Sequence, residues 1–204
     1  RMVSGVDDWT AVQDFRLLAN LDGSASFHWS YRNSGDYDQN GEVAVADLSV
    51  IGMFFGEVIG GGNWSNAVVA DGDFNGEINH ADVVPIAANF QRTIDSYTIF
   101  ESSTPQDEMS WTPLATVGFA EGYFIESTAL KQFSYQLENP DPGMSYFVQA
   151  GGAEIEPDPA KAAAIATFDA SSAGKPQNPQ ATQGTIENQV QVTWDELEGL
   201  SLIH

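Results

Sequence analysis

The chain has 204 residues, no cysteine, and 29 acidic side chains against 7 basic ones, which gives a formal net charge of −22. A surface this acidic repels phosphate backbones and anionic lipids, so we expect no nucleic-acid binding. The missing cysteines exclude disulfides, thiolate zinc sites and cysteine nucleophiles. No apolar run approaches the roughly 18 residues of a membrane span, so no membrane insertion is expected. The many glycines and few lysines fit a secreted or cell-surface protein.

The first expected elements are two β-strands, over residues 14–20 and 23–29, which are joined by a turn. The second strand carries Trp29 as its expected core residue.

An internal repeat follows these strands, at an offset of 35 residues. Residues 36–47 and 71–82 both read D-x-D-x-N-G-E-[VI]-x-x-A-D. Two full copies at one spacing are poorly explained as ordinary acidic turns, so the repeat predicts a duplicated structural unit.

The repeated spacing is that of a calcium-binding loop. Calcium prefers six to eight oxygen ligands, supplied in a 12-residue loop by side chains at positions 1, 3, 5 and 12 and by the carbonyl at position 7, with glycine at position 6 for the sharp turn. The sequence therefore predicts two Ca²⁺ sites. The predicted ligands are Asp36, Asp38, Asn40, Glu42 and Asp47 in the first loop, and Asp71, Asp73, Asn75, Glu77 and Asp82 in the second. Val43 and Ile78, at position 8, are expected to pack inward and to pair the two loops through a short β-bridge.

Each loop leads into a short helical pattern, over residues 46–56 and 81–91. The apolar residues at i, i+3 and i+7 predict one apolar face per helix. These residues are Leu48, Ile51 and Phe55 in the first helix, and Val83, Ile86 and Phe90 in the second. The segments before the loops are poor helix formers, so each unit is expected to be a loop–helix half and not a full EF-hand.

Together these features resemble the dockerin family, the duplicated calcium-loop–helix modules of secreted bacterial proteins, over residues 34–92. The resemblance implies two bound calcium ions and, in cellulosomal members, docking to a cohesin partner. At the positions where those members commonly carry a hydroxyl pair, this chain has Val45-Ala46 and His80-Ala81. The resemblance therefore carries over the calcium chemistry, and the module can equally serve as a calcium-stiffened structural insert.

Downstream, period-two alternation between turn residues predicts a run of strands. The predicted strands cover residues 96–102, 111–119, 133–137, 145–150 and 163–168. The stretch from Leu137 through a Pro-Gly turn to Tyr146 resembles the strand E–F corner of fibronectin type III domains, with Tyr146 as the corner tyrosine.

This resemblance implies that strands A and B lie before the repeat and strand C after it. We therefore expect one fibronectin type III-like β-sandwich from residues 12–33 and 93–169, with the dockerin-like module (34–92) inserted in its B–C loop. The alternative is two domains in line, with residues 1–33 as an unrelated lead. The expected fold class is mostly β, with a small α-helical two-calcium insert.

The C-terminal segment, residues 170–204, is expected to be a linker and the first strands of a second, incomplete fibronectin type III-like domain. Its strands at 176–181 and 188–195 place Trp194 as the counterpart of Trp29. Two strands cannot close a sandwich, so we expect either that the chain continues or that a neighbouring copy completes the sheet by strand addition.

No catalytic motif of the H-E-x-x-H or G-x-S-x-G kind is present, so no enzyme activity is expected. Glu121 and Glu126, the one pair that resembles glycosidase carboxylates, are interpreted as solvated. Trp64 and Phe74 are interpreted either as packing between the calcium halves or as an exposed contact surface.

The sequence thus predicts a non-catalytic, calcium-binding structural or interaction segment of a secreted or cell-surface bacterial protein. It would be a spacer, an adhesive module or a subunit of an extracellular assembly, with fibronectin-like domains or other copies of the chain as partners. The alternatives are an accessory region of a large secreted polysaccharide- or protein-degrading enzyme, and a dockerin that docks to a cohesin-like partner.

Overall fold

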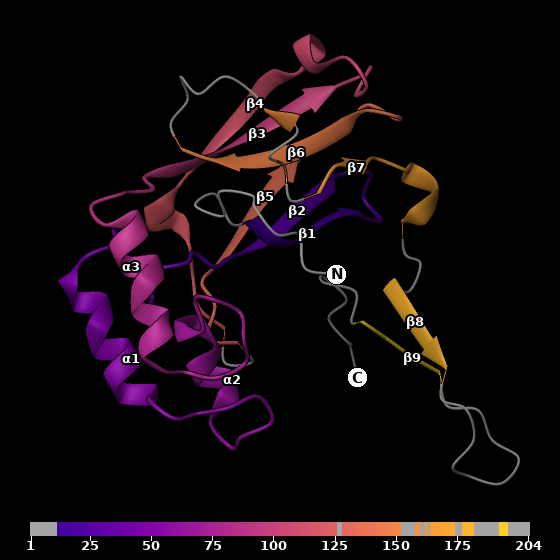
Figure 1. The fold of residues 1–204 in the computed structure, drawn as a ribbon. Helices are drawn as coiled ribbons and strands as arrows, with labels where there is room; N and C mark the ends of the chain where they lie inside the picture. Colours follow the sequence, from indigo (N-terminus) through magenta and orange to yellow (C-terminus); the bar gives the residue numbers. More distant parts are fainter. Residues whose placement is uncertain are drawn as a thin grey trace, which may run out of the picture.

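The computed structural model describes residues 12–125, 128–151, 158–159, 162, 164–173, 177–181 and 192–195. These residues are mostly β, in two antiparallel sheets with a set of short helices to one side (Figure 1). The first sheet has the order β1-β2-β5, and the second has the order β4-β3-β6-β7. The strands are β1 (Val12–Ala19), β2 (Ala25–Tyr31), β3 (Ser96–Ser102), β4 (Thr112–Gly118), β5 (Gln132–Leu137), β6 (Ser145–Ala150) and β7 (Ala166–Thr167).

Side chains from both sheets form one aromatic core. Trp29 of β2 stacks on Phe133 of β5, with ring centroids 5.6 Å apart, and packs edge-on against Tyr97 of β3 at 5.4 Å. Tyr146 of β6 meets Phe27 of β2 edge-on at 5.1 Å. All five side chains are buried, and fully burying one large apolar side chain contributes roughly 1.5–3 kcal/mol.

Strands on either side of the repeat belong to the same sheet. β2 lies before the repeat and pairs with β5 after it, in the register Phe27 with Tyr135 and Trp29 with Phe133. β3 follows the repeat directly and pairs with β4 and β6 in the other sheet. The chain therefore leaves one sheet at Tyr31 and enters the other at Ser96, and the repeat lies between these two points.

The segment between β2 and β3 contains short helices with a small core of their own. The helices are α1 (Leu48–Phe54), α2 (Trp64–Ala67) and α3 (Val83–Asn89), with 3₁₀ turns over Val45–Asp47, Val68–Ala70 and His80–Asp82. Their buried cluster consists of Tyr37, Val43, Ile51, Ala67, Ala70, Ile78 and Ile86. A core this small indicates that other interactions must help to hold the segment together.

Two expectations about these helices need correction. A short helix, α2, and a 3₁₀ turn directly precede the second loop, where the sequence indicated no helix. The apolar stripes are also not buried as units. Ile51 and Ile86 are buried, whereas Leu48, Phe55, Val83 and Phe90 are exposed. In α1 the side chains that pack beside Ile51 are Val50 and Phe54, so the buried face differs from the predicted stripe.

The expected β-bridge between Val43 and Ile78 is also wrong, although both side chains are fully buried as predicted. Each loop is instead bridged to the segment that follows the other repeat's helix, through Glu42–Thr93 and Glu77–Val58. Three hydrogen bonds recur in both bridges. In the bridge of the first loop, Gln91 N–H donates to Val43 O, Val43 N–H to Arg92 O and Ile94 N–H to Gly41 O. In the bridge of the second loop, Gly56 N–H donates to Ile78 O, Ile78 N–H to Glu57 O and Ile59 N–H to Gly76 O.

These donors and acceptors correspond one to one at the 35-residue offset, so the segment has an internal two-fold arrangement. Neither repeat makes its own bridge, and each depends on the other for it.

The remaining elements are small. Further 3₁₀ turns cover Glu108–Ser110, Phe119–Glu121 and Ala170–Ser172, and β8 (Gln177–Ala181) pairs antiparallel with β9 (Val192–Asp195). Part of the strand predicted at 163–168 is β7, whereas residues 160–161, 163, 182–191 and 196–204, including the possible third strand near the C-terminus, lie outside the described residues. Within the described part of the chain, no helix has the length and apolar character to cross a membrane.

Candidate metal centres

The two loops each bring three aspartates together. Carboxylate oxygens of Asp36, Asp38 and Asp47 lie within 4.8 Å of one another, and those of Asp71, Asp73 and Asp82 do the same. In each group the first and last aspartates are buried and the middle one is exposed. Each group could hold a metal ion.

The first aspartate of each loop organises the sharp turn. Asp36 Oδ1 accepts a hydrogen bond from Asn40 N at 3.1 Å, and its Oδ2 accepts from Gly41 N at 2.8 Å. Asp71 accepts the equivalent bonds from Asn75 N at 3.1 Å and from Gly76 N at 3.2 Å. Both glycines have positive φ, +94° and +85°, which a side chain would disfavour.

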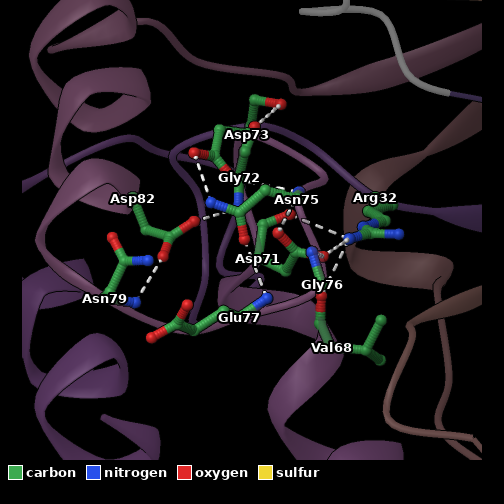
Figure 2. Close-up of polar contacts among 11 residues, drawn as sticks. Arg32, Val68, Asp71, Gly72, Asp73, Asn75, Gly76, Glu77, Asn79 and Asp82 are labelled. Atoms are coloured by element: carbon green, nitrogen blue, oxygen red, sulfur yellow. Dashed lines mark hydrogen bonds and ion pairs between the residues drawn. The ribbon is translucent and has the colours of Figure 1, made fainter. Parts of the chain in front are cut away.

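The last aspartate of each loop returns to the loop's start. Asp47 Oδ1 accepts from Tyr37 N at 2.7 Å, and its Oδ2 accepts from Ala44 N at 2.8 Å. Asp82 accepts from Gly72 N and from Asn79 N, both at 2.8 Å (Figure 2). These bonds fix the twelfth-position carboxylate next to the first, as a shared ion would require.

The asparagines and glutamates at positions 5 and 7 also correspond. Asn40 Oδ1 accepts from Glu42 N at 2.7 Å, and Asn75 Oδ1 accepts from Glu77 N at 2.8 Å. Both glutamate side chains are exposed. In each bridge the hydrogen bonds come from the residues flanking the glutamate, so the bridge does not use the glutamate carbonyl that was predicted as a ligand.

Burial disfavours the charged form of the carboxylates in these loops. It raises the pKa of Asp36 to about 7, against the lowering effect of hydrogen bonds from Tyr31 and Gly41, and the neighbouring charges of Asp47 and Asp38 raise it further. Burial also raises the pKa values of Asp47 and Asp71. Buried like charges at this spacing favour a bound cation, which would neutralise them. The donor set, made only of oxygens, fits a hard divalent ion.

The first loop is pressed against the two-sheet region. The Tyr31 hydroxyl, at the end of β2, donates to Asp36 Oδ2. Gln39 is buried, and its side chain donates to Ala129 O and accepts from Lys131 N, both at 2.6 Å. A Cβ on Gly41 would lie 2.9 Å from the Phe119 ring and 2.9 Å from Ile94 O. The sheets therefore surround this loop closely.

Two side chains of the segment just after β2 contact the second loop, and one of them, Ser34, donates its hydroxyl to Gly72 O at 3.1 Å. Arg32, just after β2, donates to Val68 O at 3.0 Å and to Asp71 O at 2.9 Å, and its Nη2 lies 3.9 Å from Asp71 Oδ2. Its guanidinium carbon is 4.4 Å from the centroid of the Phe74 ring. Figure 2 shows Arg32 on one side of the loop and Asp82 on the other. A Cβ on Gly76 would meet only Ile59, at 3.5 Å.

Sequence reasoning missed Tyr31 and Arg32 as neighbours of the loops, and it missed Gln39 as the first loop's contact with the segment before β5. Arg32 was the easiest of these to recognise from the sequence, because it is one of only 7 basic residues and stands four positions before an acidic loop. Gln39 and Phe74 share loop position 4, where one copy is polar and the other aromatic. That difference was the available signal that the loops have different surroundings.

The other residues considered from the sequence have ordinary roles where they are described. Glu121 Oε1 accepts from Gly118 N at 2.6 Å and closes a 3₁₀ turn, while Glu126 lies outside the described residues. Trp64 is half-buried against the helical core, and Phe74 is 40% exposed beneath Arg32. Of the two roles considered for these aromatic residues, packing therefore explains the position of Trp64, and it explains that of Phe74 only in part.

Comparisons of this chain with protein-family models, with curated proteins and with solved structures found no match.

Proposed function

We propose that this chain is a non-catalytic, calcium-binding structural and interaction segment of a secreted or cell-surface bacterial protein. The observation that carries the proposal is the correspondence of the two loops. Two copies of one sequence pattern form two groups of three aspartates, with matching hydrogen bonds at a 35-residue offset.

Calcium suits these loops better than the smaller or softer metals. The side-chain ligands would be Asp36, Asp38, Asn40 and Asp47 in the first loop and Asp71, Asp73, Asn75 and Asp82 in the second, with the carbonyls of Glu42 and Glu77 completing the sets. Such sets contain only oxygen, whereas zinc and copper sites draw on histidine or thiolate. A bound ion would neutralise the two buried aspartates of the first loop and would add to the positive charge of Arg32 beside Asp71 in the second.

The two-sheet region supports a fibronectin type III-like sandwich as the host of this module. If β1 to β7 are lettered A, B, C, C′, E, F and G, the two sheets have the orders A-B-E and C′-C-F-G, which is an immunoglobulin-like arrangement. Tyr146 is buried at the start of strand F. The pairing of β2 with β5 supports an insertion of residues 34–92 in the B–C loop. We propose the same sandwich type for the segment that begins with β8 and β9.

Calcium binding is tested by isothermal titration and by thermal unfolding of the calcium-free chain with and without added Ca²⁺. We expect two ions per chain and a rise in Tm on the order of 10 °C at saturating calcium, because each ion that binds only the folded state adds a few kcal/mol. The double variant Asp47→Asn, Asp82→Asn should lose both the binding and the Tm rise. Glu108→Gln, a carboxylate change outside both loops, is the matched control and should behave like the wild type. An unchanged Tm with calcium would contradict the proposal.

Calcium-dependent docking to another protein is a second candidate, favoured by the exposed apolar side chains of the helical segment. A monomeric surface rarely gathers many large apolar residues without a partner. The exposed residues on and beside α1 and α3 are Val45, Leu48, Met53, Phe55, Val83, Val84 and Phe90. Pull-down from a native extract should recover a partner with calcium, and recovery should fall in Met53→Ser, Val84→Ser. Binding that is unaffected by chelation would contradict this candidate.

A further inference from the structure

The second loop already has a positive charge at its first aspartate. The guanidinium of Arg32 is held by two backbone carbonyls, those of Val68 and Asp71, and it lies over the Phe74 ring. One of its nitrogens is 3.9 Å from Asp71 Oδ2, and the Arg32 and Asp71 side chains are only 14% and 6% exposed. Arginine keeps its proton in proteins, so this charge is permanent.

We propose that Arg32 is an internal counter-ion of the second loop, which lowers the calcium affinity of that loop and holds it in place when no metal is bound. The inference rests on the proposed calcium function and concerns how that function is regulated. Arg32 lies outside the repeat, and no residue of either loop supplies a positive charge of this kind.

The affinity effect follows from charge. A calcium ion held by Asp71 would share that carboxylate with the guanidinium, and two positive charges a few ångströms apart repel. Arg32 cannot easily move away, because its contacts are with carbonyls and an aromatic ring that do not depend on the ion. The repulsion therefore persists in the bound state and weakens binding.

The holding effect follows from the same contacts. Val68 begins the 3₁₀ turn before the loop and Asp71 begins the loop, so Arg32 ties both to the end of β2. Its charge also offsets part of the repulsion among Asp71, Asp73 and Asp82. Without calcium, the second loop should stay closer to its folded form than an equivalent loop without such a residue.

The test uses two backbone amides as separate reporters. Gly41 N–H donates to Asp36 and Gly76 N–H donates to Asp71, so their ¹H–¹⁵N NMR signals follow calcium binding at the first and second loop independently. Calcium is titrated into the full chain as wild type, Arg32→Gln, Arg32→Lys and Arg16→Gln. Glutamine keeps a donor for the carbonyls and removes the charge, and lysine keeps the charge.

Arg16→Gln is the matched control, because Arg16 is an exposed arginine on β1 whose backbone lies opposite His28, about 13 Å along β2 from Arg32. The removed charge is the same, but at that distance it is largely screened.

In Arg32→Gln the Gly76 signal should report a Kd about tenfold tighter than in the wild type, while the Gly41 signal changes by less than about threefold. Arg32→Lys and Arg16→Gln should both stay within about threefold of the wild type at both loops. Calcium-free Arg32→Gln should melt a few degrees below the wild type, on the order of 3 °C, and calcium should remove most of that difference. A tighter Kd combined with a lower calcium-free Tm is what a purely structural role would not produce.

An unchanged or weaker Kd at Gly76 in Arg32→Gln would overturn the inference and leave calcium binding intact. An equal tightening in Arg32→Gln and Arg32→Lys would overturn it as well, because charge would not be the cause. If neither glycine signal responds to calcium in the wild type, the proposed function itself fails.

Discussion

The two loops are nearly identical inside and very different outside. Within each loop, the first and last aspartates accept corresponding backbone hydrogen bonds to within a few tenths of an ångström. Outside, the first loop is enclosed by Tyr31, Phe119 and the segment before β5, whereas the second is held to the segment after β2 by Arg32 and Ser34. The comparison teaches that twelve residues encode the loop's own geometry, while its energetic link to the rest of the molecule depends on contacts with residues outside the repeat.

The largest contrast between the loops is expected at their glycines. Gly41→Ala should destabilise the chain by about 3 kcal/mol or more, because the new Cβ would be pressed against Ile94 O and the Phe119 ring in addition to the unfavourable positive φ. Gly76→Ala should cost only about 1–2 kcal/mol, since it carries the backbone cost with no such clash. Urea unfolding in saturating calcium measures both. Equal losses would show that the first loop is not constrained by the sheets.

A smaller contrast is expected between two buried tyrosines. Tyr31 donates to the carboxylate of Asp36, whereas Tyr37 donates to the neutral carbonyl of Asp82 at 2.6 Å. A bond to a charged group contributes about 1.5–3 kcal/mol and a neutral bond about 1 kcal/mol. At a pH well above the Asp36 pKa of about 7, where that carboxylate is ionised, Tyr31→Phe should therefore lower the calcium-free unfolding free energy more than Tyr37→Phe does. Urea unfolding measures both losses. A larger loss in Tyr37→Phe than in Tyr31→Phe would show that the Tyr31 hydroxyl does not link the sheet to the loop.

Loop position 4 gives the next comparison. Gln39→Ala deletes two short hydrogen bonds to the backbone before β5 and should cost about 1–2 kcal/mol. Phe74→Ala removes a ring that is 40% exposed and should cost less than about 1 kcal/mol. Hydrogen exchange provides a second readout. The amide of Lys131 should lose protection in Gln39→Ala and keep it in Phe74→Ala.

The last comparison is between the calcium-free chain at two pH values. Asp36 holds its proton more tightly in the folded state, with a pKa of about 7 against an ordinary value of 3.8. Unfolding between these values releases a proton, so stability should be greatest below pH 4 on this account and should fall as pH rises towards 7. Thermal unfolding of calcium-free protein at pH 5 and pH 7.5 should show a Tm difference of at least about 2 °C, with the higher value at pH 5.

Asp36→Asn is the control for this pH effect, because it removes the titrating carboxyl and should reduce the difference. A Tm that rises with pH in the calcium-free wild type would contradict the role given to burial. Calcium should reverse the trend, since protons and the ion compete for the same oxygens.

Much of the two-sheet region could be predicted because its signals are local. The alternation in residues 96–102 and 145–150 gave β3 and β6 with their observed bounds, and β4 and β5 lie within a residue or so of prediction. The aspartates of each loop also come together where the ligand spacing indicated. In both cases the information lies in residues close together along the chain.

What the sequence did not reveal depends on pairing between distant segments. The bridges 42–93 and 77–58 join loops to segments of only a few residues, 56–59 and 91–94, which have no clear alternation. Ile59 and Ile94 lie 35 apart and could have extended the repeat to these segments. The exposed Leu48 and Phe55 could not have been recognised, because periodicity shows that a face is apolar and not what covers it.

The bridge between Gly41 and Ile94 places the entrance and the exit of the helical segment side by side. If the chain were pulled from its two ends, the helical segment would therefore stay folded until the hydrogen bonds of that bridge break. Residues 42–93, which the bridge encloses, would then release a length of roughly 180 Å, at about 3.4 Å per residue. The force needed to break the bridge would rise with the calcium concentration. Calcium would therefore set the force at which the segment unfolds and lengthens the chain.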